Sequence, residues 1–233
     1  MNLENIKNQG GFNMQNYVEL SNKMKKSLKL GSSPIAISFS TKAPKGVEQI
    51  KSEMRLCQML DKVRFDSEIF YTTSDNHTCD GGSSSCGMKD LSERIKNGEF
   101  LLKMGLFGSE RAARRFINSN PRIESGTVKV VTFSPLEKVT FEPDVIVQIC
   151  SAKQGMIIAE AFAYESGKRT LGMTGPPICS SIVAAPFLTG EVVYSFGDHG
   201  ARNNMRIKDE EVFVGIPAEL LPCIVENLGK LNF

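Results

Sequence analysis

Short apolar segments with β propensity alternate with amphipathic helical segments along the chain, and this alternation limits the folds open to it. Strands are predicted at residues 34–39, 68–73, 127–133, 144–150, 191–196 and 211–216. Helices are predicted at residues 13–30, 53–63, 89–98, 109–118, 151–164 and 179–187, and again at the end of the chain. Because the order follows no strict strand–helix–strand period, a mixed sheet is favoured over a doubly wound parallel one. We therefore predict an α+β fold, with a mixed β-sheet and flanking helices.

The length of the chain and the distribution of polar residues predict a single compact domain. A chain of 233 residues is long enough to bury a sizeable core. Neither a Pro- or Ser-rich linker nor an internal repeat divides the sequence. We expect residues 1–12, which are mostly polar, to form a flexible tail, and residues 13–233 to form one α+β domain.

Charge and hydropathy exclude several classes of protein. The net charge is +2, and the basic residues form no strong cluster, so we expect neither nucleic acid nor an anionic membrane as a partner. Apolar runs all fall short of the ~20 residues of a membrane span. The first fifteen residues lack the apolar stretch of a signal peptide, which predicts a cytoplasmic protein. The sequence leaves open whether the protein forms a homo-oligomer.

The segment from His77 to Met88 is the most unusual part of the chain. It combines a histidine, two cysteines and three glycines with four further small polar residues. Its composition predicts a Gly/Ser-rich loop whose backbone can approach a compact ligand, while its thiols offer soft sulfur donors. Cys79 and Cys86 are too far apart in sequence to form the compact Cys-x-x-Cys motif of many zinc and cluster sites. Any metal site here therefore needs cysteines from other segments.

Two further cysteines lie where they could join such a site. Cys57 is on a predicted helix, and Cys179 follows Gly175-Pro176-Pro177 at the start of another. A helix N-terminus stabilises a thiolate through its unpaired amides and its dipole. The alternatives are that Cys57 is a buried helical cysteine, that Cys79 is an ordinary loop thiol and that Cys179 is a small core residue.

The remaining two of the six cysteines have apolar neighbours. Cys150 ends an apolar strand, and Cys223 lies among leucine, isoleucine and valine residues, so both are predicted to be core residues. This leaves four thiols that could bind a tetrahedral zinc ion or a [4Fe–4S] cluster, namely Cys57, Cys79, Cys86 and Cys179.

Ionisable residues near these cysteines suggest further roles. In an extended segment His77 would lie on the same side as Cys79, as a ligand, as a hydrogen-bond donor to sulfur or as a plain loop histidine. The turn from Asp198 to Arg202 follows a predicted strand and contains His199. Asp198 and His199 are candidates for an acid–base pair, and Arg202 is a candidate to hold an anion. A purely structural turn is the alternative.

Several short motifs, taken together in their order and spacing, resemble a known family. They are Pro34-x-Ala36, the helical Cys57, Cys79-Asp80-Gly81-Gly82 with Gly87, Pro135-Leu136, Pro143-Asp144-Val145, Ser195-Phe196-Gly197-x-x-Gly200-x-Arg202, and the ending Glu211-Val212-Phe213-Val214-Gly215-Ile216-Pro217. Over about residues 15–231 the chain resembles the prokaryotic domain-of-unknown-function family numbered 169, whose members are frequent in methanogenic archaea and anaerobic bacteria.

The resemblance implies no activity, but it bears on the cysteines. Cys57 and Cys79 fall on cysteine positions of the family. The position of Asp198 is often a cysteine in relatives, so the resemblance leaves Asp198 and Cys86 as alternatives for a fourth ligand. An anaerobic setting favours an iron–sulfur cluster over zinc, as an association only.

The leading hypothesis is a [4Fe–4S] protein that serves electron transfer, or redox chemistry on a small molecule, with a small molecule or a redox protein as its partner. Hydrogen bonds from the Gly81 and Gly82 amides to the sulfurs would tune the cluster, and His77, Arg55 and the Asp198–Arg202 turn would surround it. An open iron position would make the protein an iron–sulfur oxidoreductase. The alternatives are a zinc-stabilised binding module without catalysis and a metal-free protein with a reactive thiol, Cys79 or Cys179.

Overall fold

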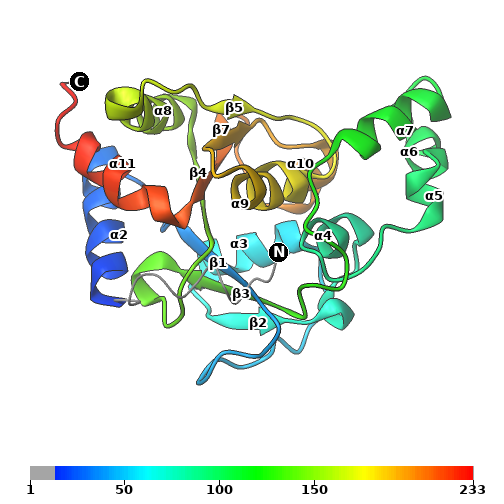
Figure 1. Ribbon diagram of the computed structural model, residues 1–233, viewed down its shortest axis with the longest axis horizontal. Coiled ribbons are helices and arrows are strands. Elements are labelled where there is room, and N and C mark those ends of the chain that lie inside the picture. Colours follow the sequence, from blue (N-terminus) through cyan, green and yellow to red (C-terminus); the bar gives the residue numbers. More distant parts are fainter. Residues whose placement is uncertain (1–13, 233) are drawn as a thin grey trace.

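A β-sheet with helices on both of its faces forms the centre of the computed structural model, which describes residues 14–232 (Figure 1). In this range seven strands pair in the order β2-β3-β1-β4-β7-β6-β5. All neighbouring strands are antiparallel except β5 and β6, which are parallel. The predicted α+β fold with a mixed sheet is therefore confirmed, while the predicted tail at residues 1–12 lies outside the described residues. The strands are β1 (Ile35–Ser40), β2 (Phe70–Thr72), β3 (Val130–Pro135), β4 (Val145–Ser151), β5 (Leu171–Gly172), β6 (Val193–Ser195) and β7 (Glu211–Pro217).

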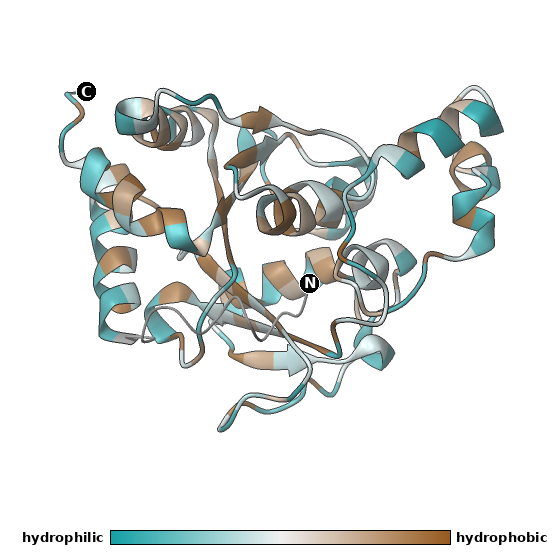
Figure 2. Ribbon diagram, in the orientation of Figure 1, coloured by the Kyte–Doolittle hydropathy of each residue, from teal (hydrophilic) through white to brown (hydrophobic). Residues whose placement is uncertain are grey.

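The two faces of the sheet bury two separate cores, because successive strand side chains point to opposite faces. On β1, Ile35 and Ile37 join one core and Ala36 joins the other. The first core is covered by α3 (Leu56–Asp66) and by a helix at residues 178–189, which contains a π-helical segment, Ser180–Ala184, and ends in α9 (Ala185–Thr189). The second is covered by α2 (Met14–Leu28), α8 (Ala152–Ser166) and α11 (Leu221–Leu228). Figure 2 shows the apolar strands running between these helical layers.

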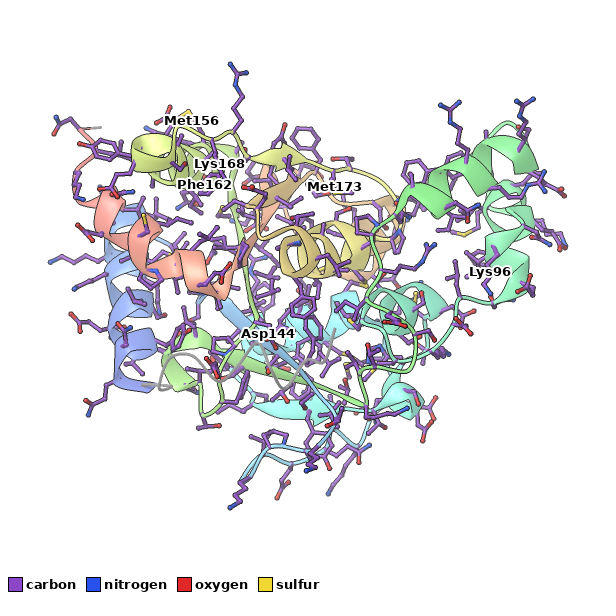
Figure 3. All side chains as sticks on the ribbon, in the orientation of Figure 1. Lys96, Asp144, Met156, Phe162, Lys168 and Met173 are labelled. Atoms are coloured by element: carbon purple, nitrogen blue, oxygen red, sulfur yellow. The ribbon has the colours of Figure 1, made fainter. Side chains whose placement is uncertain are left out.

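Three short helices form an arm that projects from the sheet (Figure 1). They are α5 (Glu93–Lys96), α6 (Glu99–Lys103) and α7 (Glu110–Ser119), and their apolar side chains pack in a small core of their own. The sequence predicts one helix at residues 89–98 here, but Gly98 separates two. Its φ of +86° and its approach to the backbone of Glu110, which leaves no room for a Cβ atom, both require glycine. Lys96 marks the arm in Figure 3.

The segment between Cys79 and Cys86 is a buried helix, α4 (Asp80–Ser85), and not the predicted loop. A Cβ atom on Gly81 would lie 2.9 Å from Cβ of Pro177, and one on Gly82 would lie 2.9 Å from Cβ of Leu56. The small residues thus allow close packing of α4 against two neighbouring segments. This packing overrides the low helix propensity of glycine and serine.

A further difference from the sequence prediction lies after β6. The segment expected to be a turn forms α10 (His199–Asn204), capped by Asp198. An aspartate followed by a short polar run is typical of a helix start as well as of a turn, because both use the carboxylate to accept backbone N–H groups.

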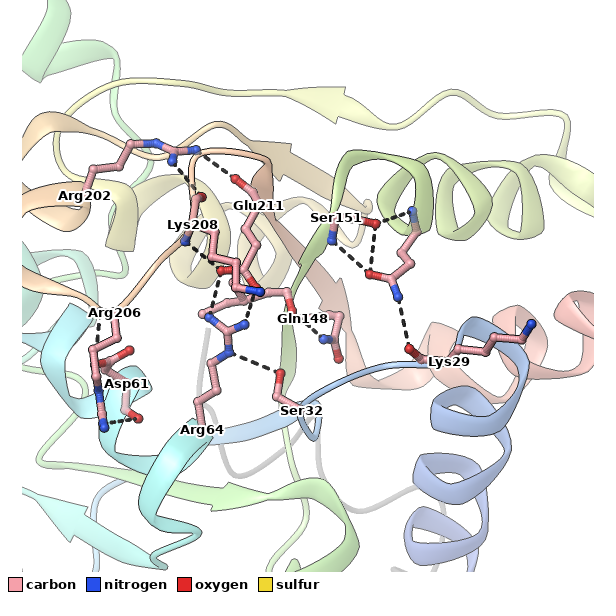
Figure 4. Close-up of polar contacts among 12 residues, drawn as sticks. Lys29, Ser32, Asp61, Arg64, Gln148, Ser151, Arg202, Arg206, Lys208 and Glu211 are labelled. Atoms are coloured by element: carbon pink, nitrogen blue, oxygen red, sulfur yellow. Dashed lines mark hydrogen bonds and ion pairs between the residues drawn. The ribbon is translucent and has the colours of Figure 1, made fainter.

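A buried ion pair ties the first core layer to the sheet (Figure 4). Arg64 on α3 forms a two-pronged pair with Glu211 at the start of β7, with Nη1 3.2 Å from Oε2. The side chains of both residues are about nine-tenths buried. Ser32 accepts a third hydrogen bond from Arg64 Nε, at 3.1 Å.

Among residues 14–232 there is no helix with the length and apolarity needed to cross a bilayer.

Candidate functional site

Three of the cysteines line a single pocket of about 110 Å³. Each stands at or beside the first residue of a helix. Cys57 is the second residue of α3, Cys79 is the N-cap of α4, and Cys179 is the second residue of the helix at residues 178–189. Asp198, the N-cap of α10, lines the same pocket. Four helix N-termini from distant parts of the sequence therefore meet at this pocket.

The position of these residues at helix starts brings unpaired backbone N–H groups to the pocket. The first backbone N–H groups of a helix have no partner within that helix. They carry partial positive charge, which favours thiolates and other anionic groups nearby. Gly81, on the first turn of α4, lies against Pro177 and near Sγ of Cys79, so the backbone of α4 is close to the sulfur.

Apolar side chains from the arm and from the segment just before it also line the pocket. They are those of Leu91, Ile95, Phe100, Met104, Leu106 and Ile117. Asn120 anchors the end of α7 to the pocket rim by donating a hydrogen bond of 2.9 Å to the carbonyl oxygen of Pro176. Soft sulfur donors and apolar side chains of the arm therefore line the same pocket.

Burial opposes ionisation of two of the pocket thiols, Cys57 and Cys179. Burial raises the pKa of Cys57 to about 12, and neighbouring Cys79 and Asp198 add to the shift. Burial also raises the pKa of Cys179 well above its ordinary value, with further contributions from Cys79, Cys57, Cys86 and Asp198. These thiols interact electrostatically, and a bound metal would have to displace their protons.

Cys86, the other predicted ligand, lies behind the pocket. It is fully buried, belongs to the first core, and is not among the residues that line the pocket. As the C-cap of α4 it donates its backbone N–H to the carbonyl of Gly82 at 3.2 Å. Burial raises the pKa of its thiol to about 12. Its electrostatic interaction with Cys179 places it near the site without making it part of the surface.

Asp198 holds two of the helix starts together. Its Oδ2 accepts a hydrogen bond of 2.5 Å from the backbone N–H of Ile178, and its Oδ1 accepts one of 2.9 Å from Ala201. The carboxylate therefore fixes α10 relative to the helix that carries Cys179.

His77 is a buried, neutral histidine beside the pocket. Thr72 donates its hydroxyl proton to the carbonyl of Val131, so it accepts from Nε2–H of His77 at 3.1 Å. Nδ1 is buried without a hydrogen-bond partner and lies near Gly82. Burial, with a smaller contribution from Lys89, lowers the pKa of His77 to about 4. The pocket wall includes Arg55 and Gly81, but not His77 or Gly82.

The other residues of the predicted turn are engaged elsewhere. Arg202 donates hydrogen bonds to three backbone carbonyls, those of Phe196 at 2.8 Å, Lys208 at 3.2 Å and Glu211 at 2.8 Å (Figure 4). His199 is exposed, and its Nε2 lies 2.9 Å from the side-chain amide of Asn203. Asp198 alone of the three lines the pocket.

The two cysteines predicted to lie in the core have different positions. Cys150 is buried at the end of β4, as expected. The prediction for Cys223 is wrong, because it lies on the outer side of α11, where its thiol is exposed and 3.7 Å from Glu165.

Among residues 14–232, no group of three or more His, Cys, Asp and Glu residues could hold a metal ion as the side chains stand.

The apolar side chains of the pocket could not be recognised as part of a site from the sequence. The arm residues carry no chemical signature, and their helical spacing indicates only that they pack against something. These arm residues become part of a site only because the arm contacts the helix starts in the folded protein.

Fold and site together define an α+β protein in which three cysteines and an aspartate at helix starts line a small pocket. The chain matches the family DUF169, described as uncharacterised ArCR, over residues 23–227, and it belongs to that family. The uncharacterized protein MJ0308 of Methanocaldococcus jannaschii is 31% identical over 188 residues, which cover 79% of this chain and 80% of that protein. No solved structure matches the chain.

Proposed function

We propose that the pocket binds a [4Fe–4S] cluster through Cys57, Cys79 and Cys179, and that the protein transfers electrons or carries out redox chemistry on a small molecule. The observation that carries the proposal is the convergence of three soft thiol donors from three separate segments on one pocket. Thiolates are the usual ligands of iron–sulfur clusters. Backbone N–H groups at the helix starts would offset the negative charge of the bound cluster and donate to its sulfurs.

The geometry favours a cluster over a single zinc ion. With Zn–S bonds of about 2.3 Å, tetrahedral ligand atoms lie only ~3.8 Å apart. In the described part of the chain, no three donor residues are arranged to hold one metal ion. A cluster needs a wider arrangement, because each thiolate binds a different iron atom. Three thiols that line one pocket and interact electrostatically would each be available to a different iron atom.

We further propose that the fourth iron has no cysteine ligand. Cys86 lies behind the pocket surface, whereas Asp198 lines it but uses both carboxylate oxygens to cap helices. A fourth position without a strong protein ligand leaves room for a small molecule, and this would make the protein an oxidoreductase. The apolar arm would shield that position from water.

Cysteine variants, purified without oxygen and analysed for iron and sulfide, test the proposal. Cys57→Ser, Cys79→Ser and Cys179→Ser should each lose most of the bound iron and sulfide. The exposed Cys223→Ser is the matched control and should retain them, and so should Cys86→Ser if the fourth iron lacks a cysteine ligand. The proposed ligands would be contradicted if Cys223→Ser lost as much iron and sulfide as the pocket variants. They would also be contradicted if all three pocket variants kept their full iron and sulfide content.

A further inference from the structure

Three arginines form a stripe along the exposed side of α7. Arg111, Arg114 and Arg115 are three and four residues apart, a spacing that puts them on one face of a helix. All three are exposed, whereas Ala113 and Ile117 on the opposite face are buried. We call these three residues the arginine stripe.

The other basic side chains on the three helices of the arm have partners, and the arginine stripe does not. Lys96 pairs with Glu93 at 3.0 Å, Lys103 pairs with Glu99, and Arg94 lies over the ring of Phe100. Within residues 14–232 the stripe has no hydrogen bond, ion pair or ring contact. Residues 89–122, which comprise the arm and the residues that flank it, contain eight basic and four acidic side chains and so carry a charge of +4, in a chain with a net charge of +2. Positive charge is therefore concentrated on the arm.

The same helix separates the arginine stripe from the thiol pocket. Ile117, on the buried face of α7, lines the pocket. A helix with its side chains is about 10–12 Å across, so a partner seated on the stripe would lie roughly one helix diameter from the pocket. This is close enough for the surface to serve the chemistry of the pocket.

We propose that the arginine stripe of α7 docks an acidic electron-carrier protein, which exchanges electrons with the cluster in the pocket. The inference rests on the proposed function. Electrostatic complementarity accelerates the encounter of two proteins, and electron-transfer complexes use small, weak interfaces that a short charged stripe can supply. In each transfer one electron leaves the reduced carrier and enters the cluster. The carrier is oxidised and the cluster reduced by one electron, and no bond forms or breaks.

The test uses a purified acidic two-cluster ferredoxin as the probe. Binding is measured by calorimetry at low and high ionic strength, and the rate of cluster reduction by the reduced ferredoxin is measured by stopped flow. The triple variant Arg111→Glu, Arg114→Glu, Arg115→Glu should bind the probe about tenfold or more weakly and be reduced correspondingly more slowly. The triple variant Lys42→Glu, Lys45→Glu, Lys51→Glu changes the net charge equally on exposed residues outside the arm, and should behave as the wild type.

Two further measurements separate this inference from the proposed function. Chemical reduction by dithionite should be equally fast in the wild type and both triple variants, because it needs no docking. A wild-type protein without iron would contradict the proposed function, while calorimetry would still test the docking. The inference would be overturned if the arginine triple variant bound ferredoxin as tightly as the wild type. It would also be overturned if the lysine triple variant lost as much affinity for ferredoxin as the arginine variant. Binding of RNA or anionic vesicles by the stripe in place of ferredoxin would overturn it as well.

Discussion

The carboxylate of Asp198 accepts a hydrogen bond of 2.5 Å from the backbone N–H of Ile178, twenty residues earlier in the chain. Because the other carboxylate oxygen caps α10, one side chain holds the starts of two helices beside the pocket. Cys179 directly follows Ile178, so the position of its sulfur depends on this contact. Asp198 thus has a structural role that a cysteine at the same place would fill less well, since sulfur is a weak acceptor.

Asp198→Ala should lower both stability and metal content. The substitution removes the cap from two helix starts and should cost about 1–3 kcal/mol of unfolding free energy, as judged from single caps. Loss of the cap also frees the helix that carries Cys179, so iron content should fall. Asp198→Asn keeps only one carbonyl oxygen as an acceptor, so its stability and iron content should lie between those of the wild type and those of Asp198→Ala. Urea unfolding and iron analysis measure both effects, and an unchanged Asp198→Ala protein would contradict the role.

His77 should make the protein less stable in mild acid. Burial lowers its pKa from 6.5 to about 4, so the folded state favours the neutral ring. The contribution of His77 to the free energy of unfolding is fully present above pH ~6.5, the pKa of the unfolded state. It is lost as the pH falls through the pKa of the folded state, and the total loss is roughly 3 kcal/mol. Urea unfolding between pH ~7 and ~4 should show a shallower decline for His77→Gln than for the wild type. The exposed His199→Gln keeps His77 and should retain the wild-type slope. Equal slopes in all three proteins would contradict this prediction.

Gly82→Ala tests the close packing of α4. The added methyl group would lie 2.9 Å from Cβ of Leu56, so α4 or α3 must shift, at a cost of about 1–3 kcal/mol. Gly108→Ala is the matched control, because a Cβ atom there has no neighbour within 4 Å. Thermal unfolding should show a lower midpoint for the first variant and little change for the second. A Gly82→Ala protein as stable as the wild type would mean that the packing is looser than described.

The ion pair between Arg64 and Glu211 should matter far more than a surface pair. Arg64→Met leaves the buried carboxylate of Glu211 without its cationic partner and should cost about 3–5 kcal/mol. Lys168→Met removes the exposed pair with Glu191 and should cost about 0–1 kcal/mol. Unfolding free energies from urea titrations compare the two, and similar values would contradict the assignment of Arg64 to a buried network.

The sequence predicted the sheet and its flanking helices because strand and helix periodicity directly reflect which faces are buried. It also grouped Cys57, Cys79, Cys86 and Cys179 as one candidate site, and three of these four line one pocket while Cys86 does not. It did not reveal that the segment of Gly81 and Gly82 is helical, because close packing against Leu56 and Pro177 outweighs propensity there. Nor did it reveal that apolar side chains of the arm line the pocket, which follows only from tertiary contact.

We propose that the pocket binds a [4Fe–4S] cluster, and anaerobic purification of the wild-type chain is the sharpest test of this proposal. Iron, sulfide and zinc are quantified together with the visible absorbance spectrum before and after reduction by dithionite. We expect about four iron and four sulfide per chain and a broad visible absorbance that bleaches on reduction. A colourless protein with about one zinc per chain and no sulfide would contradict it.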